Sequence, residues 1–532
     1  LTYTGAMSNE APPATGDQAG PTRPEAPRDA PAARGEDVGT TSARLSRGTI
    51  ARYATGSLGT GGFATLPGLV LTYYLTDSLG VAALAAGAVI TVAKVWDVVI
   101  DPVIGALTDR DLARHGSRRR LMVIGALALP VLFALTFAVP PSLGPVVAGI
   151  WVLLAFTLTA TAFSLFQVPY IALPAELTPR YDERTRLLTW RVVVLTLAIL
   201  LFGAGGPALR RVSEDPFVQY LVMGVVCGVV IGLGMLVATG VAKRAAGPTR
   251  PEAPGVAPQQ IRESAPGRRE AGNEPASRRP AVLSPEDGAT DAPAAGIRAH
   301  FAEGIGALRR SRAFRMLLST FVLQALATGL MLAGAQYVAT WVLHSQAAVE
   351  LLFVALIAPA LLAAPAWGVV ARRIGKERTF TIASIVFAIA AVSILGMLWA
   401  PGDWIYVPVG IAGIAYAGMQ SLPMAMLPDV ISHDERTHGP GRAGSFSGVW
   451  TAGETVGFAL GATTLAVILA VTGYVSSTGT QVVEQPDAAI TGIVVSFSLA
   501  PAVLIALSLL TLARYPLRRA DIDRHDTESQ PT

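Results

Sequence analysis

Long apolar runs recur along this chain, and they constrain its fold more than any other feature of the sequence. Each is about as long as a helix needs to be to cross a bilayer. The twelve expected segments lie near 50–75, 81–105, 121–139, 146–172, 187–209, 217–242, 313–340, 348–371, 379–399, 404–428, 445–472 and 490–514. No pattern of short alternating strands is present, so the sequence predicts an all-α polytopic membrane protein.

Three stretches are too polar or too rich in proline to belong to a helical bundle. Residues 1–46 are expected to form a disordered tail, 244–300 a disordered linker, and 516–532 a second tail. They separate a first six-helix bundle at 47–243 from a second one at 301–515. The sequence therefore predicts two domains of similar size.

Lysine and arginine gather in alternate loops, as in the run from Arg118 to Arg120. The loops on the other side hold almost none, apart from Arg210 and Arg211. By the positive-inside rule, the linker and both termini are expected to be cytoplasmic, in the inner membrane of a bacterium. The net charge of +4 follows from this asymmetry, so no nucleic-acid partner is expected.

One charged loop motif occurs twice, after the second segment of each bundle. It runs from Gly105 to Arg120 and from Gly368 to Arg378, and each copy has glycine, charge, glycine and then basic residues. Any short cytoplasmic loop tends to be basic, but the shared spacing and position favour a duplication. Duplicated halves commonly place a binding site between them at mid-membrane.

Three charges interrupt the second apolar segment, in the stretch KVWDVVIDP. Lys94, Asp97 and Asp101 share one face of a helix, where each charge would cost about 3 kcal/mol against lipid. They could form a static salt bridge between helices, and Asp101 could belong to a cytoplasmic gate. The sharper hypothesis is a cation site in which two carboxylates bind Na⁺ or H⁺ and Lys94 replaces the cation when it leaves.

Other polar residues in or near the apolar segments are candidates for binding and gating. Glu454, alone in its segment, could balance charge, carry a proton or form a structural hydrogen bond. The candidate substrate contacts are Gln167, Tyr170, Arg191, Tyr337 and Trp450. Arg191 could instead be an interface anchor, and Tyr337 part of an interface belt. The candidate gate residues, which could also be solvated loop charges, are Asp109, Arg110, Arg184, Arg372, Arg373, Asp429 and Arg442.

Three stretches in this order resemble a known family. They are KVWDVVIDPVIGALTDR, VPYIALPAELTPRYDERTRLLTWR and LPDVISHDERTHGPGRAGSFSGVW. Together they resemble the glycoside–pentoside–hexuronide:cation symporters of the major facilitator superfamily, of the melibiose-carrier type. The resemblance implies twelve helices in two six-helix bundles, alternating access and coupling to Na⁺ or H⁺.

The resemblance also assigns residues. It implies that Asp97 and Asp101 are the paired cation-site aspartates, that Ser164 supplies a hydroxyl, and that Arg191 binds substrate. The acidic residues that sugar carriers of this family place in two helices are absent, because Gly61 and Gln167 stand there. Either Glu454 or Thr455 stands where the family has a lysine. These departures favour a less hydroxylated or amphipathic substrate.

We therefore expect a monomeric cation-coupled transporter of a small organic solute, such as a sugar or glycoside. One alternative is a proton-driven exporter of drugs or metabolites, with Glu454 as the proton carrier. Another is a non-transporting membrane sensor or scaffold. Motifs for nucleotide binding or hydrolysis are absent, so we expect no enzyme activity, no cofactor, and no metal other than Na⁺.

Overall fold

The computed structural model describes residues 45–178, 181–242, 306, 308–438, 443–478 and 483–517. The expected linker lies outside these residues, as do the two expected tails except for two residues of each. Arg442, a candidate gate residue, also lies outside them.

All secondary structure in the described residues is helical. The first half contains α1 (Arg47–Thr55), α2 (Ser57–Tyr73), the π-helical turn η1 (Tyr74–Ser78), α3 (Ala83–His115), α4 (Arg119–Thr136), α5 (Pro145–Leu177), α6 (Tyr181–Ala208), η2 (Leu209–Val212) and α7 (Pro216–Thr239). The second half contains α9 (Arg312–Tyr337), η3 (Val338–Val342), α10 (Ala348–Ile374), α11 (Lys376–Ser393), η4 (Ile394–Leu398), η5 (Asp403–Ile405), α12 (Tyr406–His438), α13 (Ala443–Val471), α14 (Asp487–Phe497) and α15 (Leu499–Leu512).

Eleven helices of the described part are long and apolar enough to cross a membrane. The remaining expected segment, the first, consists of α1, α2 and η1 in succession. It is divided at Gly56, where a Cβ would lie 2.7 Å from the Tyr170 ring. The all-helical prediction is confirmed. The first segment, expected as one apolar run, differs most from the structure because it consists of three successive helical pieces.

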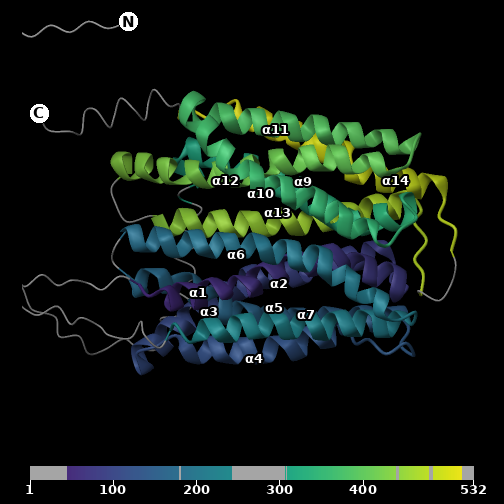
Figure 1. Ribbon diagram of the computed structural model, residues 1–532, viewed down its shortest axis with the longest axis horizontal. Coiled ribbons are helices and arrows are strands. Elements are labelled where there is room, and N and C mark those ends of the chain that lie inside the picture. Colours follow the sequence, from purple (N-terminus) through teal and green to yellow (C-terminus); the bar gives the residue numbers. More distant parts are fainter. Residues whose placement is uncertain are drawn as a thin grey trace, which may run out of the picture. The chain divides into compact units, whose positions relative to one another are not determined.

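The two halves repeat the same packing. Within the first half α4 packs against α5 and α7, and within the second half its counterpart α11 packs against α12 and α15 (Figure 1). Between the halves, α3 packs on α13 and α6 packs on α10. The second spans of the two halves are α3 and α10, and the fifth spans are α6 and α13. In both contacts, therefore, the second span of one half packs on the fifth span of the other. This symmetry is what a duplicated sequence predicts.

Glycine ends the second span of each half. Gly116 follows α3 with φ of 64°, and Gly375 follows α10 with φ of 94°. Only glycine adopts such angles without steric cost, which stops the helix and turns the chain into the next one. These are the second glycines of the two repeated loop motifs, so the repeated motif has a structural reason.

Candidate cation site and gates

The three charges of α3 lie together with a hydroxyl group from α5. Lys94 Nζ lies 3.0 Å from Asp97 Oδ2. One turn farther along α3, the Asp101 carboxyl lies beside the Ser164 hydroxyl and is affected by the charges of Asp97 and Lys94. Ser164 is 4% exposed. The structure thus brings together all four residues named from the sequence for cation binding and exchange.

Two carboxylate oxygens of this cluster have no hydrogen-bond partner among the described residues. They are Asp97 Oδ1 and Asp101 Oδ1, and both are buried. Buried oxygens are nearly always paired with protein, water or an ion, so these two, on adjacent turns, can each accept such a partner. Carboxylate and hydroxyl oxygens are suitable ligands for a hard cation. The cluster can hold a small cation or a proton.

Lys94 has aromatic neighbours as well as a carboxylate. Its Nζ lies 5.4 Å from the centre of the Phe63 ring and 5.8 Å from that of Phe156. The faces of these rings stabilise a positive charge. One interpretation of the sequence was a salt bridge that joins two helices. Lys94 and Asp97 both lie on α3, so their salt bridge does not do this. It is free to break without separating the bundle.

The candidate substrate residues of the first half contact neighbouring helices. Thr60 Oγ1 donates to Gln167 Oε1 at 2.8 Å. Tyr170 is fully buried, and its hydroxyl donates to the Tyr53 carbonyl at 2.8 Å. The Arg191 guanidinium lies 5.5 Å from the centre of the Tyr170 ring, and its Nε has no partner among the described residues. Tyr170 is therefore engaged within its half, whereas Arg191 keeps an unpaired donor.

Gly61, which the resemblance puts where sugar carriers have an acidic residue, lies at a close approach of α2 and α6. A Cβ built there would lie 2.7 Å from the Ala198 Cβ and 3.0 Å from the Leu195 carbonyl oxygen. No carboxylate fits at this position unless the two helices separate. The close packing of α2 on α6 therefore excludes an acidic side chain at position 61.

The second half contributes an aromatic pair and a carboxylate. Trp450 is 2% exposed and stacks on Phe321, with ring centres 4.3 Å apart. Glu454 is half-buried, one turn farther along α13, and lies near Tyr416 of α12. No charged partner acts on its carboxylate among the described residues. A carboxylate in this setting remains available to a proton or to a polar group of a solute.

We call the end of the helices where α2 leads into η1 the Asp77 end, and the opposite end the Arg118 end. At the Arg118 end of the first half, Arg118 bonds to Asp109 at 2.7 Å and to Glu176 at 2.5 Å. Burial alone would lower the pKa of the Arg118 guanidinium, but the bonds to Glu176 and Asp109 raise that pKa above its ordinary value. Arg184 donates to the backbone carbonyl that follows α5, at 3.3 Å, and Arg110 is exposed.

The second half has a matching bond at the same end. Lys376 Nζ lies 2.6 Å from Asp429 Oδ2 and donates to the Ala425 carbonyl at 2.9 Å. Arg372 and Arg373 are exposed, and Arg372 lines a cavity of about 580 Å³ between α10, α11 and α12. In each half a basic residue of the repeated loop thus binds an acidic residue near the end of the fourth span. These bonds lie within halves, not between them.

Several hydrogen bonds join the two halves at the Asp77 end. Candidate substrate residue Tyr337 lies here, fully buried, with its hydroxyl 2.7 Å from Thr76 Oγ1. The Tyr474 hydroxyl donates to Asp77 Oδ1 at 2.5 Å. Asp77 is only 5% exposed, so a buried carboxylate of the first half is bound by the second. Tyr337 is thus part of a closed end and not of an open binding surface.

Two arginines complete this closed end. Arg210 is 3% exposed, and its Nη2 donates to Gln336 Oε1 at 2.6 Å. Arg211 forms an ion pair with Glu350 through both guanidinium Nη atoms. We did not identify these residues from the sequence as a gate. The signal was available, since Arg210 and Arg211 are the basic residues in loops that otherwise hold almost no lysine or arginine.

Two halves of six spans, with the same pairs of helices in contact between them, define a membrane transporter of the major facilitator fold. Solved structures agree with this. The nucleoside transporter NupG matches with a TM-score of 0.55 at 12% identity, over 88% of this chain and 98% of that one. A D-xylose–proton symporter matches with a TM-score of 0.55 at 13% identity, over 84% and 96%. At these identities the likeness concerns the fold alone.

The family follows from the sequence match. The model of the MFS/sugar transport protein family covers residues 52–264 and 285–519, so the chain belongs to that family. An uncharacterized symporter of Synechocystis is 24% identical over 88% of this chain and 94% of its own length. The glucuronide carrier protein homolog of Escherichia coli is 27% identical over 33% of this chain and 39% of its own. These relatives bear out the resemblance to glycoside–pentoside–hexuronide:cation symporters and indicate a multi-pass membrane transporter, not an enzyme.

Proposed function

We propose that this protein is a cation-coupled importer of a small organic solute that works by alternating access. The observation that carries the proposal is the pair of unpaired buried oxygens of Asp97 and Asp101 beside Lys94. A cation bound there would compete with Lys94 for the Asp97 carboxylate. Cation binding would then change the charge balance inside the first half, which coupling to solute movement requires.

The proposed solute is a sugar derivative or glycoside with an apolar part. The glucuronide carrier homolog and its relatives carry names that point to sugar derivatives, which supports the sugar part. Gly61 leaves no room for a carboxylate that would bind hydroxyl groups, which supports the apolar part. Arg191 and Gln167 of the first half, with Trp450 of the second, are the proposed contacts.

The proposed location is the bacterial inner membrane, with both termini in the cytoplasm. The basic residues of the Arg118 end support this orientation by the positive-inside rule. The Asp77 end would then face outward, and its hydrogen bonds between halves would make this an outward-closed state. A reporter fused after residue 517 that proved active only outside the cytoplasm would overturn the orientation.

The direct test is Na⁺ binding to the purified protein by calorimetry at two pH values. Wild type should give saturable heat, and Asp97→Asn with Asp101→Asn should abolish it, because both unpaired oxygens lose their charge. Asp403→Asn, an exposed residue before α12, is the control and should bind like wild type. Unchanged Na⁺ heat in the double variant would reject this site.

A second candidate is a proton-driven exporter of drugs or metabolites, and it is favoured by the position of Glu454. That half-buried carboxylate has no charged partner among the described residues. Under this candidate Na⁺ gives no heat at either pH, while Glu454→Gln abolishes proton-driven flux in proteoliposomes. Saturable Na⁺ binding together with Na⁺-driven uptake would exclude it.

A further inference from the structure

A layer of apolar contacts between the halves lies inside the polar contacts of the Asp77 end. Phe353 of α10 is 4% exposed, and its ring lies so close to α6 that a Cβ built on Gly203 would collide with it. Leu332 of α9 lies against α2 in the same way, since a Cβ on Gly68 would lie 2.8 Å from Leu332 Cδ2. The halves approach this closely because both positions are glycine.

This layer is distinct from the polar layer described above. Gly203 precedes Arg210 by seven residues, and Gly68 precedes Thr76 by eight. On the second half Phe353 is three residues from Glu350, and Leu332 is four from Gln336. At a rise of about 1.5 Å per residue, the apolar contacts lie roughly 5–12 Å deeper than the polar ones. The Asp77 end is therefore closed twice, first by polar side chains and then by Phe353 and Leu332.

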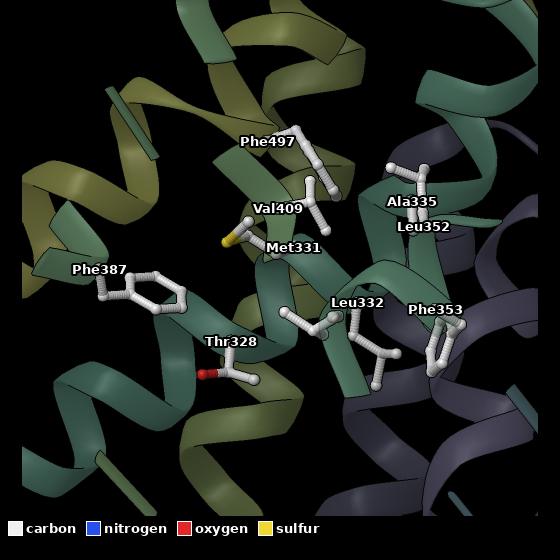
Figure 2. Close-up of a pocket in the computed structure, with 10 residues that line it drawn as sticks. Thr328, Met331, Leu332, Ala335, Leu352, Phe353, Phe387, Val409 and Phe497 are labelled. Carbon is white, nitrogen blue, oxygen red and sulfur yellow. The ribbon is translucent and has the colours of Figure 1, made fainter. Parts of the chain in front are cut away.

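A small apolar cavity lies directly behind these two side chains (Figure 2). Its volume is about 50 Å³, and Phe353 and Leu332 form part of its wall. Its one polar lining side chain is Thr328, which donates to the Gln324 carbonyl at 2.9 Å. A water there would lack the two to four partners it needs, so the lining favours an apolar occupant. The other walls are Met331, Ala335, Leu352, Leu356, Phe387, Val409 and Phe497.

Protein interiors are packed closely enough that a ring can move only where there is space. The Phe353 ring has Gly203 on one side and this cavity on another. We propose that Phe353 and Leu332 form an apolar gate, that Gly203 and Gly68 are the seats they occupy when the gate is closed, and that the cavity gives the Phe353 ring room to turn away from Gly203 when the gate opens. The inference rests on the proposed alternating access.

The test measures the distance between spin labels across the Asp77 end. Glu214→Cys and Gln346→Cys place labels on exposed residues of the two halves, while the native Cys227 is buried. Gly203→Ala should move most of the distance distribution to longer values, because the added methyl group blocks the seat. Gly205→Ala is the matched control on the same helix, where the nearest atom to the added Cβ is 3.8 Å away. It should keep the parental distances.

Two further variants separate a blocked seat from general damage to α6. In a Phe353→Ala background, Gly203→Ala should cause no further shift, because the colliding ring is gone. Ala335→Val should enrich the shorter distances, because it fills the cavity that the ring needs. A Gly203→Ala distribution like that of wild type would overturn the proposal, as would an equal shift in the Phe353→Ala background. If Gly203→Ala does not fold, Gly68→Ala tested with and without Leu332→Ala decides in the same way.

Failure of this inference can be told apart from failure of the proposed function. The distances are measured without substrate or Na⁺, whereas coupling is measured by Na⁺ heat and uptake on the same preparations. Distances that shift as expected in a protein that binds no Na⁺ would support the gate and reject Na⁺ coupling. Normal Na⁺ binding with unshifted distances would reject the gate and support Na⁺ coupling.

Discussion

At the residue scale, the proposed cation site puts Lys94 in competition with the cation. Lys94 Nζ lies 3.0 Å from Asp97 Oδ2, so a cation bound to Asp97 would compete with it for the same carboxylate. Two charges about 4 Å apart interact by about 4 kcal/mol at an effective dielectric constant near 20. Removing even part of the attraction between Lys94 and Asp97 should therefore change the measured cation affinity.

Lys94→Met should therefore lower the Kd for Na⁺ by about tenfold, which corresponds to about 1.4 kcal/mol. Solute uptake should slow at the same time, because the empty transporter keeps two carboxylates without a balancing charge. Calorimetry and counterflow measure the two effects. Lys94→Arg is the control and should stay near wild type. Weaker Na⁺ binding in Lys94→Met would mean that Lys94 supports the fold of the site.

At the scale of elements, the helix ends were the part of each span hardest to predict. The second apolar run was placed at 81–105, yet α3 continues to His115. Its charged last turns leave the apolar region without interrupting the backbone hydrogen bonds, and only Gly116 stops it. Hydropathy predicts where a segment leaves the lipid, whereas the backbone conformation of residues such as Gly116 determines where the helix ends.

Gly116 offers a clean test of that geometry. A Cβ there would meet nothing within 4 Å, so the cost of Gly116→Ala comes from its φ of 64° alone. We expect stability to fall by about 1 kcal/mol, seen as a lower thermal midpoint in detergent. Gly144→Ala is the control, since that position is also open but has φ of −67°. Equal midpoints for the two variants would show that the left-handed turn is not needed.

At the scale of the whole molecule, the proposed alternating access requires the Asp77 end to open. Arg211 and Glu350 form an ion pair between the halves there. Arg211→Cys with Glu350→Cys, joined by a short reducible cross-linker, should reduce uptake to background, and reduction should restore it. Ser213→Cys with Gln219→Cys links residues that already touch within the first half and should leave uptake unchanged. Full uptake with the first pair linked would argue against opening at this end.

The sequence predicted the helical class, the two halves and the cluster of Lys94, Asp97 and Asp101. These features are local, because the length of an apolar run and the spacing of charges on one helix depend only on residues that are close together in the sequence. The sequence was less informative for Tyr170 and Tyr337. Their residue type suggests solute binding, yet both are fully buried, one within the first half and the other between the halves.

By itself the sequence determined what must lie in the membrane and which charges must avoid lipid, since burying apolar length and pairing charge are requirements of each segment alone. Only the tertiary structure decided which end is closed and by which residues. Asp77 with Tyr474, Arg210 with Gln336, and Gly203 with Phe353 are far apart in the chain. Their contacts depend on how the two halves pack against each other, and no local pattern of residues encodes that.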